Sequence, residues 1–172
     1  IVPQSPALFR GSIRSNLDAA GDRSDDDLRT ALSRVQLSHL DVDQALSDSG
    51  GNVSIGERQL LCLARTLLRA RKLLIMDEAT ANVDHVSDRN IQNVIQNEMP
   101  STSVITIAHR INTIIYYDNV MVLDQGTMTE FGEPAALLAN SASHFTGLCH
   151  ATGDFDGLLQ EATKAAAARL KN

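Results

Sequence analysis

Residues 73–78, Leu-Leu-Ile-Met-Asp-Glu, decide the fold class of this chain. Four apolar residues run directly into two acids, a pattern typical of a strand that is buried on both faces of a parallel sheet. A second apolar run at residues 104–108 ends at His109, and helical patterns at residues 54–70 and 86–99 precede the two runs. Strands that alternate with helices predict an α/β fold with a largely parallel sheet.

The composition fits one ordinary globular domain. The chain has 172 residues, of which 43% are hydrophobic and 21% are charged, and these fractions are usual for a folded protein. The net charge of −6 and the lack of a basic run argue against a surface that coats nucleic acid. Cys62 and Cys149 match no metal or redox spacing. No apolar run reaches the ~18 residues of a membrane-spanning helix, so we expect any membrane role to come through a partner or another part of the polypeptide.

Weaker patterns predict the remaining elements. Three aspartates follow Ser24, where negative charge suits the first turn of a helix. Short apolar runs at residues 120–123 and 127–131 flank Asp-Gln-Gly and predict a pair of strands. Residues 48–52 have the composition of a loop, and the Ala-rich stretch 161–170 predicts a helix.

The polar residues that end the two apolar runs carry the first functional clue. Ligands of open α/β sheets gather at the carboxyl ends of the strands. There Asp77 can hold Mg²⁺, and Glu78 can polarise a water molecule as a general base. Taken alone, two acids at a strand end are as often a solvated terminus as a site.

Residues 53–59, Val-Ser-Ile-Gly-Glu-Arg-Gln, are more specific. Here a loop enters a helix, and the backbone N–H groups of a helix N-terminus together with a serine hydroxyl form an anion site. We expect Gly56 to let the backbone approach a phosphate closely. Ser54 and Glu57 also have the spacing of a capping box, and both interpretations can hold together.

Four stretches in the same order resemble the motifs of ATP-binding cassette (ABC) ATPases. Residues 53–59 resemble the signature motif, in the variant of the multidrug-resistance-associated, or subfamily C, transporters. Residues 77–84 look like the Walker B acids that run into the D-loop, and residues 106–110 look like the switch loop. A strand end at residues 1–2 leads into a stretch, residues 2–14, that looks like the Q-loop of exporter-type cassettes.

The resemblance covers residues 1–138 and implies a fold. That fold is a P-loop NTPase-like (ABC ATPase) parallel sheet whose N-terminal part is missing from this chain, with a helical signature subdomain at about residues 8–70. Residues 139–172 then form a C-terminal helical tail, to which no motif assigns a role.

The resemblance also implies roles for individual residues. Glu78 and His109 would be the catalytic residues, and Gln4 and Asp77 would hold the metal. The residues that would contact the nucleotide are Gln4, Ser54, Ile55, Gly56, Glu57 and Asp84.

By the same resemblance, the chain is part of the Mg-ATP-hydrolysing cassette that powers export through a membrane. The implied cofactors are ATP and Mg²⁺. The implied partners are the transmembrane domains of the same transporter and a second cassette, with no nucleic acid, and the cassette would lie on the cytoplasmic side of the membrane.

Two alternatives stay open: a soluble ABC ATPase that is not linked to a membrane, and a truncated regulatory module without catalysis. The transported substrate is not readable from these residues.

The chain departs from the family pattern in three respects. It has no G-x-x-x-x-G-K-S/T stretch, so we expect the fragment alone to bind ATP weakly and not to hydrolyse it. Glu57 stands where the family usually has Gln, and we hypothesise that its charge weakens ATP-driven closure. Ile55 replaces a glycine, and together with Glu78 it indicates a second, hydrolytically competent cassette of subfamily C.

Overall fold

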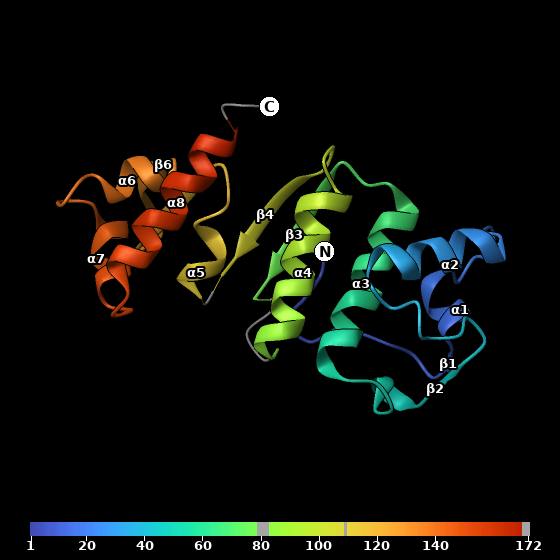
Figure 1. Ribbon diagram of the computed structural model, residues 1–172. Coiled ribbons are helices and arrows are strands. Elements are labelled where there is room, and N and C mark those ends of the chain that lie inside the picture. The colour runs from blue at the N-terminus through green and yellow to red at the C-terminus, as the bar shows by residue number, and fades with distance from the viewer. Residues whose placement is uncertain (79–82, 109, 170–172) are drawn as a thin grey trace. The chain divides into compact units, whose positions relative to one another are not determined.

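Two parallel strands pair in the first part of the chain in the computed structural model, which describes residues 1–78, 83–108 and 110–169 (Figure 1). Strand β3 (Leu73–Asp77) pairs with β4 (Ser103–Ile107), with Leu73 opposite Ser103 and Asp77 opposite Ile107. An isolated parallel bridge joins Val2 to Met76 on β3. The predicted α/β class, both strands and the strand end at residues 1–2 are confirmed.

The prediction that both strands are buried on both faces is wrong. Leu74 and Met76 of β3 are 0% and 1% exposed and belong to the core, but Leu73 is 50% exposed. Ile105 and Ile107 of β4 are 55% and 56% exposed. Successive side chains of a strand point to opposite faces, so one face of this small sheet is covered and the other is open to solvent in this chain.

Two long helices share the core of the first unit with the buried face of the sheet. Helix α3 (Ile55–Arg69) begins after the N-cap Ser54 and ends at Ala70, which has the left-handed backbone conformation common at helix ends. Helix α4 (His85–Glu98) begins after the N-cap Asp84 and ends just before Pro100. The two helices contact each other and share one core with Leu74. The predicted helices at 54–70 and 86–99 are therefore confirmed within one residue at each end.

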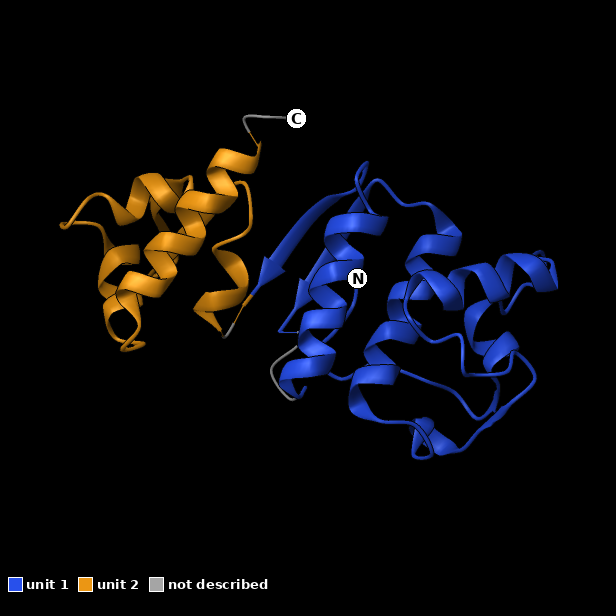
Figure 2. Ribbon diagram, in the orientation of Figure 1, with its two compact units in different colours: residues 1–107 blue, residues 108–172 orange. Residues whose placement is uncertain are grey.

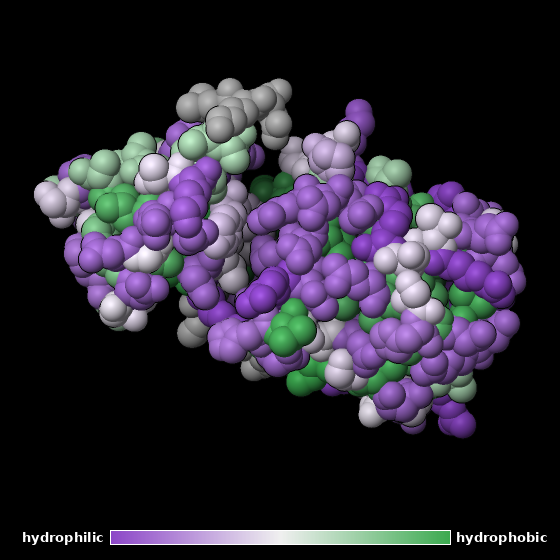
Figure 3. Space-filling view, in the orientation of Figure 1, coloured by the Kyte–Doolittle hydropathy of each residue, from purple (hydrophilic) through white to green (hydrophobic). Residues whose placement is uncertain are grey.

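Shorter elements surround the far side of α3. Helix α2 (Asp25–Arg34) packs against α3 and begins after Ser24, as predicted. The structure adds a reciprocal capping box between Ser24 and Asp27, which was not predicted. Helix α1 (Ile13–Leu17) also contacts α3. Three further elements were not predicted: β1 (Gly11–Ser12), its antiparallel partner β2 (Ala45–Leu46), and the 3₁₀ turn η1 (Asp48–Gly50) inside the predicted loop. On the face seen in Figure 3, the surface over α2 and α4 is mostly hydrophilic.

The chain divides into two compact units, residues 1–107 and 108–172 (Figure 2). In the second unit, β5 (Val120–Asp124) and β6 (Thr127–Gly132) pair in antiparallel fashion around Gln125 and Gly126, which both have positive φ. The predicted strand pair is thus confirmed. The domain boundary predicted at residue 138 concerns the extent of a resemblance and stays a prediction.

Four helices complete the second unit within the described residues: α5 (Ile111–Ile114), α6 (Pro134–Leu138), α7 (His144–His150) and α8 (Phe155–Arg169). Phe145 and Cys149 of α7 pack with Leu158 of α8 in a separate core. Helix α8 confirms the predicted helix and begins six residues earlier, at Phe155. None of the helices in the part of the chain that the structure describes is both long and apolar enough to cross a membrane.

Glu130 of β6 holds the start of α7. Its carboxylate accepts hydrogen bonds from Phe145 N at 2.9 Å, His144 N at 2.7 Å and Ser143 Oγ at 2.8 Å. These donors, with the Phe145 bond the largest cause, hold the pKa of Glu130 below its usual value. A negatively charged carboxylate at a helix N-terminus also interacts favourably with the helix dipole.

Replacement of Glu130 by Gln should reduce the acid sensitivity of the second unit. Because the folded-state pKa is lowered, the stabilisation by Glu130 is complete above its unfolded pKa and is lost as the pH falls through the folded pKa. Glu130→Gln should therefore lower the thermal midpoint at about pH 7 and lose less stability than the unchanged chain between about pH 5 and pH 2. Tyrosine fluorescence reports on this unit alone, because both tyrosines, Tyr116 and Tyr117, lie in it and the chain has no Trp.

The matched control is Glu133→Gln, which alters an exposed glutamate that makes no side-chain cap to α6. Equal acid midpoints for the Glu130 variant and the unchanged chain would contradict the assigned contribution.

Candidate functional site

Gln4 and Glu78 meet at the carboxyl edge of the sheet, although 74 residues separate them. Val2 N donates to Ile75 O at 2.8 Å and Asp77 N donates to Val2 O at 3.1 Å, which fixes residues 1–2 beside β3. Gln4 follows this bridge directly, and its Nε2 donates to Glu78 Oε2 at 3.0 Å. The pairing of parallel strands therefore brings two of the predicted site residues into contact.

Glu78 has an uncommon backbone conformation. Its φ of 44° lies in the left-handed region, which is unfavourable for a residue with a side chain. The residue is also tied to the neighbouring strand, because Glu78 N donates to Ile107 O at 2.9 Å. Such conformations persist where the surrounding structure over-determines them, and they cluster at functional sites.

Two further predicted residues belong to the same edge in sequence. Asp77 is the last residue of β3 and its side chain is exposed. His109 follows the end of β4 by two residues but lies outside the described residues, as do residues 79–82 of the predicted D-loop. The structure therefore brings Gln4 and Glu78 together, with Asp77 adjacent, and the place of His109 stays a prediction.

The start of α3 carries the other predicted contacts. Ser54 N donates to Glu57 Oε2 at 2.7 Å, and Glu57 N donates to Ser54 Oγ at 3.2 Å. This is the reciprocal capping box that the sequence predicted. Ile55 is 40% exposed although it is apolar, so the first turn of α3 presents a short apolar surface beside polar backbone groups.

Glu57 has a second partner that the sequence did not indicate. His39 Nε2 lies 2.9 Å from Glu57 Oε1. Partial burial raises the pKa of Glu57, but the hydrogen bonds from Ser54 and His39 outweigh it, so that the pKa lies below its usual value. Both carboxylate oxygens therefore face donors of the same chain.

The structure gives Gly56 a role in packing that was not predicted. Gly56 is buried, and a Cβ on it would lie 2.5 Å from the Cβ of Ser87 in the first turn of α4. Asp84 caps α4 by accepting from Val86 N and Ser87 N, each at 3.0 Å, and the bonds from Ser87 are the first cause of its lowered pKa. The predicted signature and the helix that follows the predicted D-loop therefore start in close contact.

Gln59 is a buried polar residue that the sequence reasoning did not assign to the site. It is 1% exposed, and its Nε2 donates to Gln4 O at 3.0 Å and to Pro3 O at 3.3 Å. Its position in the sequence could have indicated its burial, because Gln59 directly precedes the apolar residues Leu60 and Leu61 on α3.

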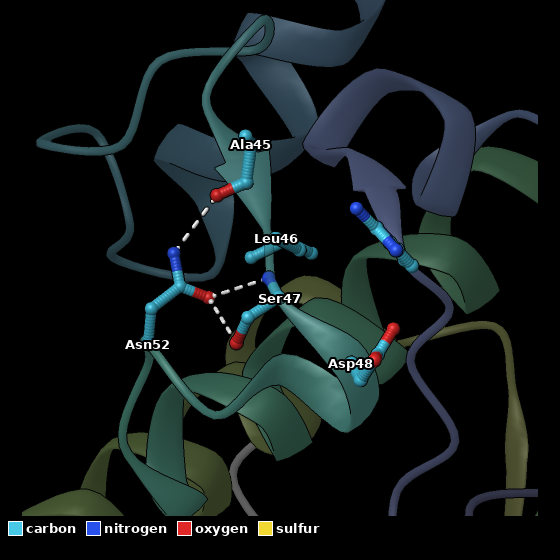
Figure 4. Close-up of a pocket in the computed structure, with 6 residues that line it drawn as sticks. Ala45, Leu46, Ser47, Asp48 and Asn52 are labelled. Atoms are coloured by element: carbon cyan, nitrogen blue, oxygen red, sulfur yellow. Dashed lines mark hydrogen bonds between the residues drawn. The ribbon is translucent and has the colours of Figure 1, made fainter.

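A hollow of about 550 Å³ is lined by other residues (Figure 4). Asn52 bridges two of the residues that line the hollow: its side chain donates to Ala45 O at 2.8 Å and accepts from Ser47 N at 2.9 Å. The hollow is lined by Arg10, Ala45, Leu46, Ser47, Asp48 and Asn52. None of these is a predicted site residue.

The oxygen ligands at the sheet edge fit a magnesium site that the protein shares with substrate phosphates, rather than one that protein ligands enclose. Gln4 offers an amide oxygen and Asp77 a carboxylate. Mg²⁺ commonly binds one or two carboxylates together with substrate phosphates and water. Among residues 1–78, 83–108 and 110–169, no three or more His, Cys, Asp or Glu side chains group as a set of metal ligands.

Comparisons with known proteins agree with this geometry. The family described as ABC transporter matches residues 1–81. A pleiotropic ABC efflux transporter of multiple drugs from Candida glabrata is 40% identical over 194 residues, which cover all of this chain and 12% of that protein. Human ATP-binding cassette sub-family C member 4 is 48% identical over 151 residues, covering 84% of this chain and 11% of that protein. A bacterial Atm1-family ABC exporter, solved with ATP bound, superposes with a TM-score of 0.77 at 28% identity, covering 88% of this chain and 28% of that one.

The fold is thus that of an ABC ATPase, represented here by part of its α/β sheet and by α3. The chain belongs to the ABC transporter family, and the named relatives of 40% identity or more include subfamily C transporters. The chain spans about one-eighth of the length of the curated relatives that it matches.

Replacement of Gly56 by Ala should destabilise the first unit. An extra methyl group would collide with Ser87, and overpacking of this kind costs about 1–3 kcal/mol, which exceeds the gain of up to about 1 kcal/mol in helix propensity. Urea unfolding followed by circular dichroism measures the loss. Ser87→Gly should restore part of the stability of Gly56→Ala, whereas Ser87→Ala, which keeps the Cβ, should not.

Gly147→Ala is the matched control. Gly147 lies inside α7, and a Cβ there would meet nothing within 4 Å. That variant should be as stable as the unchanged chain or more stable. Equal effects at Gly56 and Gly147 would contradict the packing role of Gly56.

Proposed function

We propose that this chain is part of the ATP-binding and ATP-hydrolysing cassette of a membrane exporter. The observation that carries the proposal is the contact between Gln4 and Glu78, which joins the predicted Q-loop to the predicted general base at one sheet edge. The capping box at the start of α3 adds an exposed helix N-terminus of the predicted signature type. The names of the relatives, an efflux transporter and members of sub-family C, support export as the process that the cassette powers.

In this proposal, hydrolysis depends on positioning and charge. Glu78 accepts a proton from the water that attacks the γ-phosphorus. Gln4, which is hydrogen-bonded to Glu78, orients that water. Gln4 and Asp77 would hold Mg²⁺, which neutralises charge on the phosphates when it is bound. His109 contacts the γ-phosphate and stabilises the charge that develops on it.

The second half of the proposal concerns partners. Ser54, Ile55, Gly56 and Glu57 face a nucleotide on a second cassette, and Asp84 lies near the interface between the two. Transmembrane domains of the same transporter anchor the cassette at the cytoplasmic side of a membrane. The open apolar face of β3 and β4, with Leu73, Ile105 and Ile107 exposed, supports a further layer of the cassette that covers this sheet.

The direct test is Glu78→Gln in the intact protein that contains this chain. The amide oxygen of the substituted side chain can still accept the hydrogen bond from Gln4, so the geometry is kept while the proton acceptor is removed. We expect Mg²⁺-dependent ATP hydrolysis to fall by at least about 10²-fold and equilibrium binding of ATP to stay unchanged. Glu133→Gln, on an exposed side chain of the second unit, serves as the control and should hydrolyse ATP like the unchanged protein.

Hydrolysis that survives Glu78→Gln would overturn the role of Glu78. No hydrolysis by the unchanged intact protein would favour the non-catalytic regulatory alternative. Hydrolysis by a purified protein without membrane-spanning segments of its own would favour the soluble ATPase.

The charge of Glu57 provides a second prediction. Glu57→Gln keeps the cap, since Gln occupies this position of a capping box equally well, and it removes a carboxylate near the phosphate of the partner cassette. We expect the ATP concentration needed for association of the two cassettes to fall by about two- to tenfold. Unchanged association, measured by cross-linking or light scattering, would contradict the hypothesis.

A further inference from the structure

Gln59 joins the start of α3 to the loop that carries Gln4. Its Nε2 donates to two successive carbonyl oxygens, Pro3 O at 3.3 Å and Gln4 O at 3.0 Å. The side chain of Gln4 in turn donates to Glu78 at 3.0 Å. A continuous series of hydrogen bonds therefore runs from α3 through the backbone of Gln4 to the predicted general base.

The hydrogen bonds of the buried Gln59 side chain go to the loop that carries Gln4. Gln59 Oε1 is buried and has no hydrogen-bond partner among the described residues. The hydrogen bonds printed for this side chain are therefore those that its Nε2 donates to the backbone of Pro3 and Gln4.

Arg65 contacts the residues that follow this loop, at points other than those that Gln59 contacts. From a position further along α3, Arg65 Nη1 donates to Ala7 O at 2.7 Å and its Nη2 donates to Asn16 Oδ1 at 2.9 Å. Asn16 also bonds Phe9 N at 2.8 Å. Because these contacts hold residues 7–16 on α3, the separate contribution of Gln59 is to the position of residues 3–4.

We propose that Gln59 is a positioning residue for hydrolysis: it sets the backbone of Gln4 so that the Gln4 side chain reaches Glu78. The inference rests on the proposed function. Gln59 lies five residues after Ser54 on the same helix, so a displacement of the capped start of α3 moves the hydrogen-bond donor of Gln59 and with it Gln4. A nucleotide that contacts the predicted signature at the start of α3 can in this way influence Gln4 and Glu78 at the sheet edge of the same chain.

The test compares Gln59→Met with Gln4→Ala and with the double variant, in the intact protein with Mg-ATP. Methionine keeps the length of Gln59 and removes its donors. We expect kcat to fall by at least about tenfold, because misplacement of a positioned group has effects of this size, while KM for ATP stays within about twofold. Residues that act as one unit are not additive, so the double variant should have the kcat of Gln4→Ala alone. Arg65→Met, which releases residues 7–16 instead, is the matched control, and its effect on kcat should multiply with that of Gln4→Ala.

The inference is overturned if the effect of Gln59→Met on kcat multiplies with that of Gln4→Ala, or if Gln59→Met changes KM and not kcat. These outcomes leave the proposed function intact whenever Glu78→Gln abolishes hydrolysis. Hydrolysis that persists in Glu78→Gln marks a failure of the proposed function, and the inference falls with it.

Discussion

Two backbone hydrogen bonds between Val2 and β3 are the constraint on which the candidate site depends. They join Val2 N to Ile75 O and Asp77 N to Val2 O, and they place the first residues of the chain in parallel beside a strand that begins about seventy residues later. Parallel strands end at the same edge of a sheet. The polar residues that follow each strand are therefore collected at one edge, whatever their separation along the chain, and Gln4 bonds Glu78 there.

Helix α3 performs three tasks with one short stretch of sequence. Ser54 and Glu57 close its N-terminus, Gly56 permits close approach of α4 at Ser87, and Gln59 contacts the carbonyl oxygens of Pro3 and Gln4. These residues occupy the first two turns of a single rigid helix. A shift at its capped end is consequently transmitted both to the start of α4 and to the loop that carries Gln4, because buried close contacts leave little room for independent movement.

The sheet of the first unit has unequal faces. Leu74 and Met76 point into the core that α3 and α4 complete, whereas Leu73, Ile105 and Ile107 lie on the open face. Exposed apolar side chains that gather on one sheet face indicate an interaction surface. The matched relatives are much longer than this chain.

The sequence by itself determined the elements whose causes are local. The helix start at Ser24, the capping box at Ser54, the end of α4 before Pro100 and the turn at Gln125–Gly126 all follow from residues within a few positions of each other, and each was predicted correctly. The order of the motifs likewise determined the family. The tertiary structure alone decided the burial of the strands and the packing of Gly56 against Ser87. It also decided the hydrogen bond from His39 to Glu57 and the one from Gln59 to the backbone of Gln4. Each of these joins residues far apart in the chain or depends on which face of a strand finds a partner, and the hydrophobic pattern of one segment carries no information about the segment that covers it.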